Sequence, residues 1–395
     1  MKIVYHYHIP AMIKNERIYT MAQQGLFIDE LAKHNSIIYC FFHKPLSNEK
    51  KLMDYKIEEK NIKLISIGYH TKIYFRILFN RLFMKNFKDF CKNFDAIIIR
   101  QPTPLLPYFS NLAKSKTAII LTVGDSELEV GSNQQHFIKS LLVKLYVKYF
   151  TKNLLRATKK SFMLVNNPEA FDKWSGSVID IKQISTGLMK KEWLHKRKDT
   201  CQKNIINVLF TGRIEKQKGV IDIAKAVVPI IIRGYNIFFH VVGETVKGDN
   251  SLNKIKNIFQ RNNLNNNLRV HGFLPFGEKL FDKYRKADIF ITASTTYEGF
   301  PRTIYEALSH SLPVITTKIG GVPKLLSHRQ NAMLCEPKNP LSLENAIVEI
   351  IEKKNLRRKI IKNGYTFSKL FTIENSVKLI DKQIKNWINS NNSNQ

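Results

Sequence analysis

Acidic residues are scarce in this sequence, which has 32 Asp and Glu against 63 Lys and Arg and a formal net charge of +31. Such an excess of positive charge favours negatively charged partners, above all nucleic acid and anionic membrane surfaces. However, the sequence lacks a helix-turn-helix pattern, a zinc-ligand spacing, an RRM-like aromatic motif and a basic low-complexity tail. Three interpretations of the charge therefore stay open: nucleic-acid binding, association with an anionic membrane, and compositional drift in a chain rich in Lys, Asn and Ile.

Cysteine and long apolar runs are scarce too. The four cysteines, Cys40, Cys91, Cys201 and Cys335, form no C-x-x-C pair, which predicts reduced thiols in a cytosolic protein rather than disulfides or a zinc site. The apolar run at the N-terminus is too short for a signal peptide. Nowhere do 18 apolar residues follow one another, so no transmembrane helix is expected. We therefore expect a cytoplasmic protein.

Length and patterning predict an α/β protein. The 395 residues, with 44% hydrophobic and 11% aromatic residues, suit a globular chain of two domains. Short apolar runs, such as Ala118–Val123 and Ile206–Phe210, alternate with helical patterns, such as Arg17–Lys33 and Val220–Ile232. This alternation predicts two parallel sheets with helices on both faces.

The segment Ala287–Leu308 carries the strongest functional signal. An apolar strand leads into a Gly-Phe-Pro turn, from which a helix begins at Pro301, where a missing N–H costs no helical hydrogen bond. The amides of Thr303 and Ile304 are then expected to face an anion such as phosphate. Carboxylates at Glu298 and Glu306 flank this position, which suggests a ligand with two sets of hydroxyls, such as a nucleotide sugar.

A second signal lies in the segment Asn207–Val220. It reads as a buried strand, a glycine turn and a helix, with Arg213 and Lys218 in the turn. Ligands of open α/β sheets bind at this end of the strands. Two cations there would offset the charge that develops on a departing diphosphate.

These two segments resemble retaining glycosyltransferases of the GT-B fold, family 4, also described as glycosyl transferases group 1. The resemblance rests on the E-x7-E spacing of Glu298 and Glu306, the strand before it, the Gly-Phe-Pro turn, and Gly320 and Gly321 beyond. It covers residues 200 to 365 in motifs and the first 190 only in architecture. It implies two Rossmann-like domains facing a central cleft, with a C-terminal helix crossing back to the N-terminal domain. The expected parts are an acceptor-binding domain over residues 1–187 plus the crossing helix 371–389, a nucleotide-sugar domain over residues 188–370, and a flexible tail over residues 390–395.

The resemblance also implies roles for individual residues. Glu306 would hold the ribose hydroxyls, Glu298 a hydroxyl of the transferred sugar, and Arg213 and Lys218 the diphosphate. The remaining donor contacts would come mainly from the backbone, at Gly243, His271, Gly299, Phe300, Thr303 and Ile304. Retaining members are thought to need neither a protein nucleophile nor a metal, and we expect no cofactor and no metal site here.

The N-terminal half departs from the family pattern. Asp125 follows the strand Ala118–Val123 and would either hydrogen-bond a sugar hydroxyl or cap the next helix. Both alternatives stay open. His8 and Arg17 flank a loop that we expect to line the acceptor site.

Two stretches of the N-terminal half mix large apolar residues with cations. The stretch Lys72–Lys92 includes Arg76, Arg81 and Lys85, and Lys139–Lys160 has the same character without an acid. Such helices are typical of anionic membrane surfaces, although a core helix with a solvated basic face has the same composition. We keep both interpretations, and the first makes the protein peripheral on the inner face of the cytoplasmic membrane.

We expect an enzyme that transfers a sugar from a nucleoside-diphosphate sugar to a saccharide or lipid-linked acceptor with retention, in the synthesis of a bacterial surface polysaccharide, lipopolysaccharide or glycolipid. The alternatives are a nucleotide-sugar-processing enzyme of the same fold, such as an epimerase, and a basic nucleic-acid-binding protein. The donor sugar, its base, the acceptor and the oligomeric state are not predicted.

Overall fold

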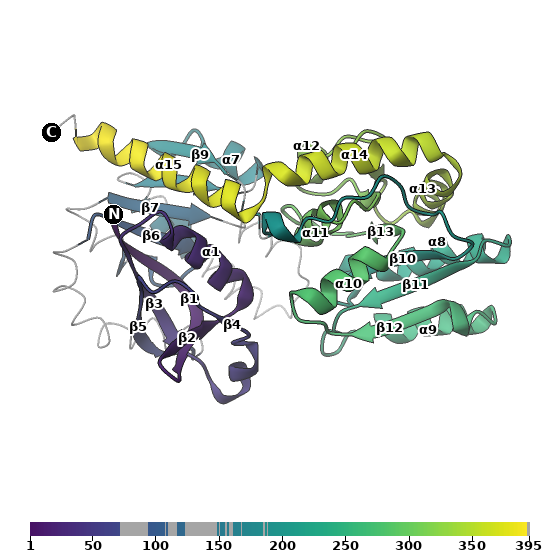
Figure 1. Ribbon diagram of the computed structural model, residues 1–395, viewed down its shortest axis with the longest axis horizontal. Coiled ribbons are helices and arrows are strands. Elements are labelled where there is room, and N and C mark those ends of the chain that lie inside the picture. The colour runs from purple at the N-terminus through teal and green to yellow at the C-terminus, as the bar shows by residue number, and fades with distance from the viewer. Residues whose placement is uncertain are drawn as a thin grey trace. The chain divides into compact units, whose positions relative to one another are not determined.

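The computed structural model describes residues 1–71, 94–106, 108–109, 117–122, 148–149, 151–154, 156–157, 161–166, 168–184, 186–187 and 189–392. By internal contacts the chain divides into two units, Met1–Leu188 with Ile373–Gln395, and Met189–Thr372. Each unit has its own sheet and its own hydrophobic core (Figure 1). The prediction of an α/β fold with two parallel-sheet domains is thus confirmed.

The first unit is built on a parallel sheet in the order β5-β3-β1-β6-β7-β8-β9. Its strands are β1 (Lys2–Lys14), β3 (Ile37–Lys44), β5 (Ile62–Tyr69), β6 (Ala96–Gln101), β7 (Thr117–Thr122), β8 (Phe162–Val165) and β9 (Asp180–Gln183). Strand β2 (Arg17–Thr20) pairs antiparallel with β1, and β4 (Tyr55–Lys56) pairs antiparallel with β2. The other described elements are α1 (Ala22–Ala32), the 3-10 turn η1 (Ser47–Leu52) and α7 (Pro168–Trp174).

One secondary-structure prediction in this unit was wrong at its start. The helix expected over Arg17–Lys33 begins only at Ala22, because residues 17–20 pair with the long end of β1 as a hairpin. The turn of this hairpin is at Asn15 and Glu16, which both have positive φ. The apolar pattern of the helix extended back into this strand, and the pairing partner could not be seen in the local pattern.

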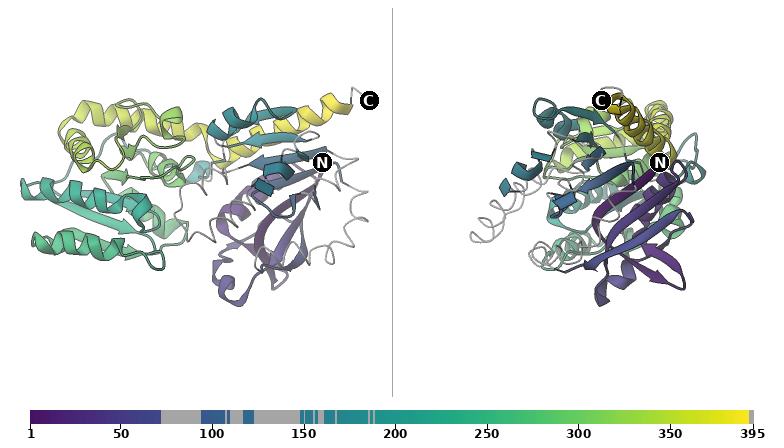
Figure 2. Two further views of the ribbon diagram at one scale, coloured as in Figure 1. Left: turned by 180° about the vertical axis from the view of Figure 1, so that it is seen from behind. Right: turned by 90° about the vertical axis from the view of Figure 1, so that its left-hand side faces the viewer.

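The last helix, α15 (Ile373–Asn392), belongs to the first unit (yellow in Figure 1 and Figure 2). Its Trp387 ring stacks on Phe162 of β8 with centroids 5.5 Å apart. Its Asp381 accepts a hydrogen bond of 3.1 Å from Asn35, just beyond α1. The helix continues to Asn392, so residues 390–392, which were predicted to belong to a flexible tail, are helical.

The second unit has a sheet of six parallel strands in the order β12-β11-β10-β13-β14-β15. The strands are β10 (Ile206–Thr211), β11 (Ile237–Val242), β12 (Leu268–Gly272), β13 (Ile289–Thr292), β14 (Val314–Thr317) and β15 (Met333–Cys335). One face packs on α8 (Val220–Ile232), α9 (Ser251–Arg261) and α13 (Pro340–Glu352). The other packs on α10 (Glu278–Lys286), α11 (Arg302–Ser309) and α12 (Val322–Leu325). Helix α14 (Lys354–Leu370) and the 3-10 turns η3 (Lys191–Trp193), η4 (Lys216–Lys218) and η5 (Asn265–Asn267) complete this unit.

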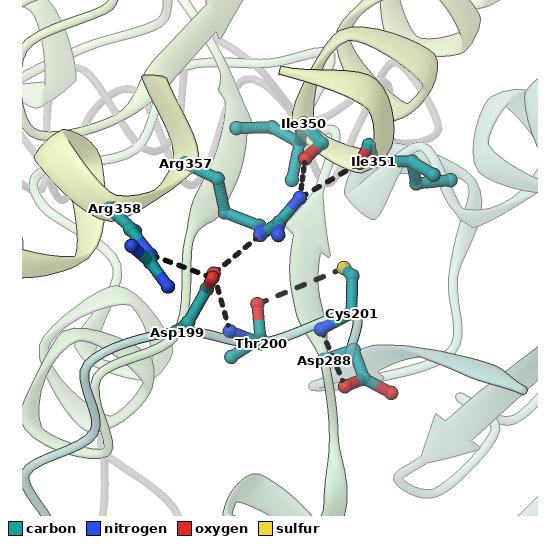
Figure 3. Close-up of polar contacts among 8 residues, drawn as sticks. All are labelled: Asp199, Thr200, Cys201, Asp288, Ile350, Ile351, Arg357 and Arg358. Atoms are coloured by element: carbon teal, nitrogen blue, oxygen red, sulfur yellow. Dashed lines mark hydrogen bonds and ion pairs between the residues drawn. The ribbon is translucent and has the colours of Figure 1, made fainter. Parts of the chain in front are cut away.

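A buried ion pair joins the segment before β10 to helix α14 within the second unit (Figure 3). The Asp199 carboxylate accepts hydrogen bonds from Nε of Arg357 at 2.7 Å and from Nε of Arg358 at 2.8 Å. Arg357 also donates to the carbonyls of Ile350 and Ile351, at 2.8 Å each. Burial disfavours ionisation of Asp199, but the two arginines outweigh it and lower the pKa of this carboxyl.

None of the helices in the described parts of the chain combines the length and the apolar composition that a bilayer-spanning segment needs.

Candidate donor-binding and catalytic site

The candidate site lies where the parallel strands of the second unit end. Parallel strands bring their carboxyl ends to one edge of the sheet, so the turns after β10, β11, β13 and β14 meet there. Close backbone contacts draw these turns together. A Cβ added to Gly219 would lie 1.8 Å from the carbonyl oxygen of Ala293, and one added to Gly320 would lie 1.6 Å from that of Glu298. Glycine at these two positions therefore positions the turns that carry Lys218 and Glu298.

Lys218 and Glu298 are brought into direct contact. The Lys218 ammonium group forms an ion pair with Oε1 of Glu298, and both side chains are largely buried. Burial lowers the pKa of Lys218 to about 8, with Arg213 acting in the same direction. The ammonium group is therefore mostly charged at neutral pH and easily deprotonated above it. Two residues 80 positions apart in the sequence form one polar pair at the sheet edge.

Arg213 lies at the outer side of this pair. Its side chain is 67% exposed and forms an ion pair of 3.1 Å with Glu215. Arg302, the first residue of α11, is a third nearby cation, since its charge acts on the pKa values of both Lys218 and Glu306. Arg302 lies inside the segment with the strongest functional signal, but it was not predicted as a site residue. The motif therefore brings at least three positive charges close to Glu298.

Glu306 is buried in a hydrogen-bonded row of side chains. Its Oε2 accepts a hydrogen bond of 2.7 Å from the Tyr284 hydroxyl, and Tyr284 lies 2.6 Å from Oγ1 of Thr211. Burial raises the pKa of Glu306, against the opposing effects of Tyr284 and Arg302. Tyr284 was not predicted, because it comes from α10 and reaches Glu306 only through the packing of α10 on the sheet. The Thr211–Tyr284–Glu306 row fixes the carboxylate at the end of β10.

One detail of the predicted phosphate site was wrong. The amide of Ile304 donates to the carbonyl of Pro301 at 3.1 Å, so it is used within the first turn of α11. The earlier amides of this turn, including that of Thr303, are the ones that remain for an anion. Gly299 and Phe300 lie in the turn before the helix, and the Gly299 carbonyl accepts from Gly321 at 2.9 Å.

Gly243 and His271 complete the row of strand ends. The Gly243 amide donates to the Gly272 carbonyl at 2.8 Å, and a Cβ added to Gly243 would lie 1.8 Å from the Gly212 carbonyl oxygen. His271 shares a hydrogen bond of 3.0 Å with His240 of β11. The predicted donor-site residues from Arg213 to Glu306 therefore belong to one edge of one sheet.

The first unit contains the two residues predicted for the acceptor, but it does not bring them together. Arg17 pairs with Lys14, six residues beyond His8 along β1, which corresponds to about 20 Å of strand. Arg17 is exposed on the hairpin. The His8 carbonyl accepts a hydrogen bond of 2.9 Å from His70, whose other ring nitrogen lies 2.6 Å from Glu49.

A buried cation in the first unit was not predicted. Arg100, near the carboxyl end of β6, is 7% exposed, and its guanidinium lies over the rings of Tyr7 and Phe27 at 5.2 and 5.5 Å. No carboxylate in the described parts of the chain forms an ion pair with it. Arg100 lies beside Tyr7 because β6 pairs with β1 in the sheet. No local sequence pattern shows this pairing.

Asp125 and the basic residues Arg76, Arg81 and Lys85 lie outside the described residues, so their roles stay predictions. Within the described residues, no cluster of three or more His, Cys, Asp and Glu side chains is arranged to hold a metal ion.

Residues 191–367 match the family described as "Glycosyl transferases group 1". The "Uncharacterized glycosyltransferase MJ1069" of Methanocaldococcus jannaschii is 26% identical over 389 residues, which cover 92% of this chain and 94% of that protein. The "Capsular polysaccharide biosynthesis glycosyltransferase CapM" of Staphylococcus aureus is 24% identical over 62% of this chain and 64% of its own length. Some alignments are shorter, and one covers only 45% of another M. jannaschii glycosyltransferase.

The fold is similar to that of solved glycosyltransferases. The structure titled "Crystal structure of Anabaena Alr3699/HepE in complex with UDP" superposes with a TM-score of 0.70 at 17% identity, covering 99% of this chain and all of that one. This likeness shows the fold, and the family match covers the unit that contains the Lys218–Glu298 pair. Residues 191–367 are thus similar to group 1 glycosyltransferases, and the two-unit α/β fold is that of solved glycosyltransferases of the GT-B type.

Proposed function

We propose that the protein is a retaining family 4 glycosyltransferase that transfers a sugar from a nucleoside-diphosphate sugar to a hydroxyl group, without a metal ion. The observation that carries the proposal is the largely buried Lys218–Glu298 pair, at the same sheet edge as Arg213 and the buried Glu306. A diphosphate leaving group develops negative charge, and preorganised cations in a partly buried site stabilise that charge.

Each of the proposed residues would bind a different part of the donor. Arg213, Lys218 and the first-turn amides near Thr303 would hold the diphosphate, whose charge competes with Glu298 for the Lys218 ammonium. Glu298 is then available to accept a hydrogen bond from a hydroxyl of the transferred sugar. Glu306, held by Tyr284, would accept hydrogen bonds from the ribose hydroxyls.

The leaving phosphate would take the acceptor proton on the same face of the sugar from which it departs. This route forms the new glycosidic bond with retention and requires no protein nucleophile. Asp125 keeps its two alternatives, a contact to the sugar or a helix cap.

The acceptor is proposed to be a saccharide or lipid-linked saccharide of a surface polysaccharide, lipopolysaccharide or glycolipid. The name of the S. aureus relative, a capsular polysaccharide biosynthesis glycosyltransferase, supports this class of acceptor. Arg100 suits an acceptor with an anionic group, because a buried guanidinium is stabilised by a carboxylate or a phosphate. The basic stretches around Arg76 and within Lys139–Lys160 would hold the protein against the anionic inner face of the cytoplasmic membrane.

The test of retention is the anomeric configuration of the product. With an α-linked donor, we expect an α-linked product, read from the anomeric proton coupling in an NMR spectrum of the reaction mixture. A β-linked product would overturn the retaining mechanism. Unchanged product formation in EDTA is expected for metal independence, and loss of activity that Mn²⁺ restores would contradict it.

A further inference from the structure

A row of polar side chains crosses the face of the second sheet that α10 covers. Asp288 accepts hydrogen bonds from the backbone and side-chain nitrogens of Asn207, at 2.9 and 3.3 Å. Asn207 Oδ1 lies 3.0 Å from Nε2 of His240. Nδ1 of His240 lies 3.0 Å from Nε2 of His271. The two imidazole planes are within 5° of each other, with centroids 5.2 Å apart, as expected for rings that share an in-plane hydrogen bond.

The direction of every hydrogen bond in this row follows from its first member. A carboxylate only accepts, so the NH₂ group of Asn207 faces Asp288 and its Oδ1 faces His240. An amide oxygen only accepts, so Nε2 of His240 carries the proton and Nδ1 carries a lone pair. His271 must then donate from Nε2, which leaves its own Nδ1 as an acceptor.

The electrostatics support neutral rings. Burial lowers the pKa of His240 to about 4, and His271, Lys283 and Arg269 act in the same direction. Burial also lowers the pKa of His271, again with Lys283 and Arg269. Both rings are therefore neutral at pH 7, as the row requires.

His271 lies at an irregular position near the end of β12. Val241 pairs with Val270, but Val242 pairs with Gly272, so His271 is an extra residue in β12. Strand alternation already puts His271 on the face of His240, because Arg269 pairs with His240 and side chains two residues apart share a face. The bulge follows at the strand end, and the hydrogen bond to His240 shows that the His271 ring keeps this side.

Glu306 and His271 are spaced for one nucleoside. Thr211 at the end of β10 lies on the same face as His240, since Leu209 is paired with His240, and its Tyr284 partner holds Glu306. β10 and β12 are separated by one strand, so their ends lie about 10 Å apart. A nucleoside with its ribose at Glu306 spans this distance with its base at His271.

We propose that Nδ1 of His271 accepts a hydrogen bond from a ring N–H of the donor's base, as carried by uracil, thymine or guanine, and that His240 and Asn207 are the residues that position it. The proposal rests on the proposed donor site and identifies which side of the base is recognised. It disfavours bases with a lone pair at that ring nitrogen, because two acceptors would then face each other.

The first test compares UDP with N3-methyl-UDP, and GDP with N1-methyl-GDP, by calorimetry on the full-length protein. We expect the methylated form of the preferred nucleotide to bind about tenfold or more weakly. His271→Ala should remove this difference while leaving the affinity for inorganic pyrophosphate unchanged. Equal binding of both members of each pair to the wild-type protein, or discrimination that persists in His271→Ala, overturns the proposal. Failure of every nucleoside diphosphate to bind overturns the proposed function instead.

The second test separates positioning from folding. His240→Phe keeps a planar ring but removes the acceptor for Nε2 of His271. We expect it to lower the discrimination against the methylated nucleotide while the protein still unfolds in one cooperative transition, at a lower melting temperature because Asn207 loses its donor. Lys256→Ala, on the exposed side of α9, should change neither the discrimination nor the melting temperature. In ¹⁵N spectra, the Nδ1 resonance of His271 should shift on UDP binding and stay in place with pyrophosphate. A resonance that does not move with UDP contradicts the proposal.

Discussion

The Tyr284 hydroxyl donates a hydrogen bond of 2.7 Å to the carboxylate of Glu306 and is itself 2.6 Å from Oγ1 of Thr211. The tyrosine comes from the helix that covers the sheet, and the glutamate from the helix that begins at the candidate phosphate site. This contact makes the orientation of Glu306, which we propose as the ribose ligand, depend on the packing of α10.

Tyr284→Phe should therefore weaken nucleotide binding without removing the carboxylate. The change leaves Glu306 buried without its donor, which costs about 1–3 kcal/mol of stability, and we expect the Kd for the preferred nucleoside diphosphate to rise about tenfold. Calorimetry and urea unfolding measure the two effects. Tyr69→Phe, at a 59% exposed tyrosine of the first unit, is the control and should change neither. Unchanged nucleotide affinity in Tyr284→Phe would show that the Thr211–Tyr284–Glu306 row does not contribute to donor binding.

Removal of either member of the Lys218–Glu298 pair should affect turnover. We expect Lys218→Ala to lower kcat by about 100-fold, because it removes a preorganised cation from the leaving group. Glu298→Ala should mainly lower kcat, with a smaller effect on nucleotide affinity. Steady-state kinetics with the identified donor provides the measurement, and Lys216→Ala, at an exposed lysine of the same turn, is the matched control. Full activity in the Lys218 or Glu298 variant would remove that residue from the mechanism.

The affinity for pyrophosphate should depend on pH through Lys218. Its pKa is lowered to about 8 in the free protein, and bound phosphate raises it by stabilising the charged form. The affinity for pyrophosphate is therefore highest below pH 8. It falls as the pH rises above 8, by up to about tenfold per pH unit. Calorimetry between pH 6.5 and 9.5 tests this. Lys218→Arg should flatten the profile, since arginine stays protonated throughout, and an unchanged profile in that variant would assign the pH dependence to another group.

The contribution of Asp199 to the free energy of unfolding should depend on pH. Its pKa is lowered in the folded protein, so its contribution is complete above the pKa of about 4 of the unfolded chain and is lost as the pH falls through the lower folded value. Asp199→Asn leaves Arg357 buried without its partner and should cost about 3 kcal/mol at pH 7. Urea unfolding at pH 7 and below pH 4 measures both effects.

Arg358→Gln is the control for Asp199, because Arg358 is 48% exposed and should contribute less than about 1 kcal/mol. An Asp199→Asn protein as stable as the wild type at pH 7 would contradict the role of the buried pair.

Membrane association can be tested on the basic stretch Lys72–Lys92. Charge reversal at Arg76, Arg81 and Lys85 should release the protein from vesicles that contain anionic lipid, because each basic residue near such a surface contributes about 1 kcal/mol. Donor binding should be unchanged. Vesicle sedimentation with and without phosphatidylglycerol is the measurement, and equal sedimentation of both proteins would make this stretch an ordinary solvated surface.

Much of the second unit could be predicted from the sequence, because its site residues stand in two continuous strand–turn–helix segments. Arg213, Lys218, Glu298 and Glu306 could be placed at strand ends from local patterns alone. Tyr284 and His240 could not, since they reach the site through the packing of α10 and the pairing of β11 with β12. The Ile304 amide was assigned to the ligand because the sequence does not show that the first turn of α11 closes on Pro301.

Less of the first unit could be predicted, because its function depends on residues that come together only in the sheet. Arg17 begins β2 after the turn at Asn15 and Glu16, and the hairpin pairs it with Lys14 rather than with His8. Arg100 has an unremarkable sequence context, and its position beside Tyr7 and Phe27 follows from the pairing of β6 with β1 and the packing of α1. Long-range pairing of this kind leaves no trace in local periodicity.

Binding of UDP, GDP, CMP, ADP and dTDP to the wild-type protein and to Glu306→Ala, with and without EDTA, shows directly whether the second unit holds a nucleoside diphosphate at Glu306. We expect the protein to bind one of these diphosphates selectively, with an affinity that EDTA leaves unchanged and that Glu306→Ala largely removes. No binding of any of these nucleotides, together with tight, salt-sensitive binding of polynucleotide that survives Glu306→Ala, would contradict this expectation.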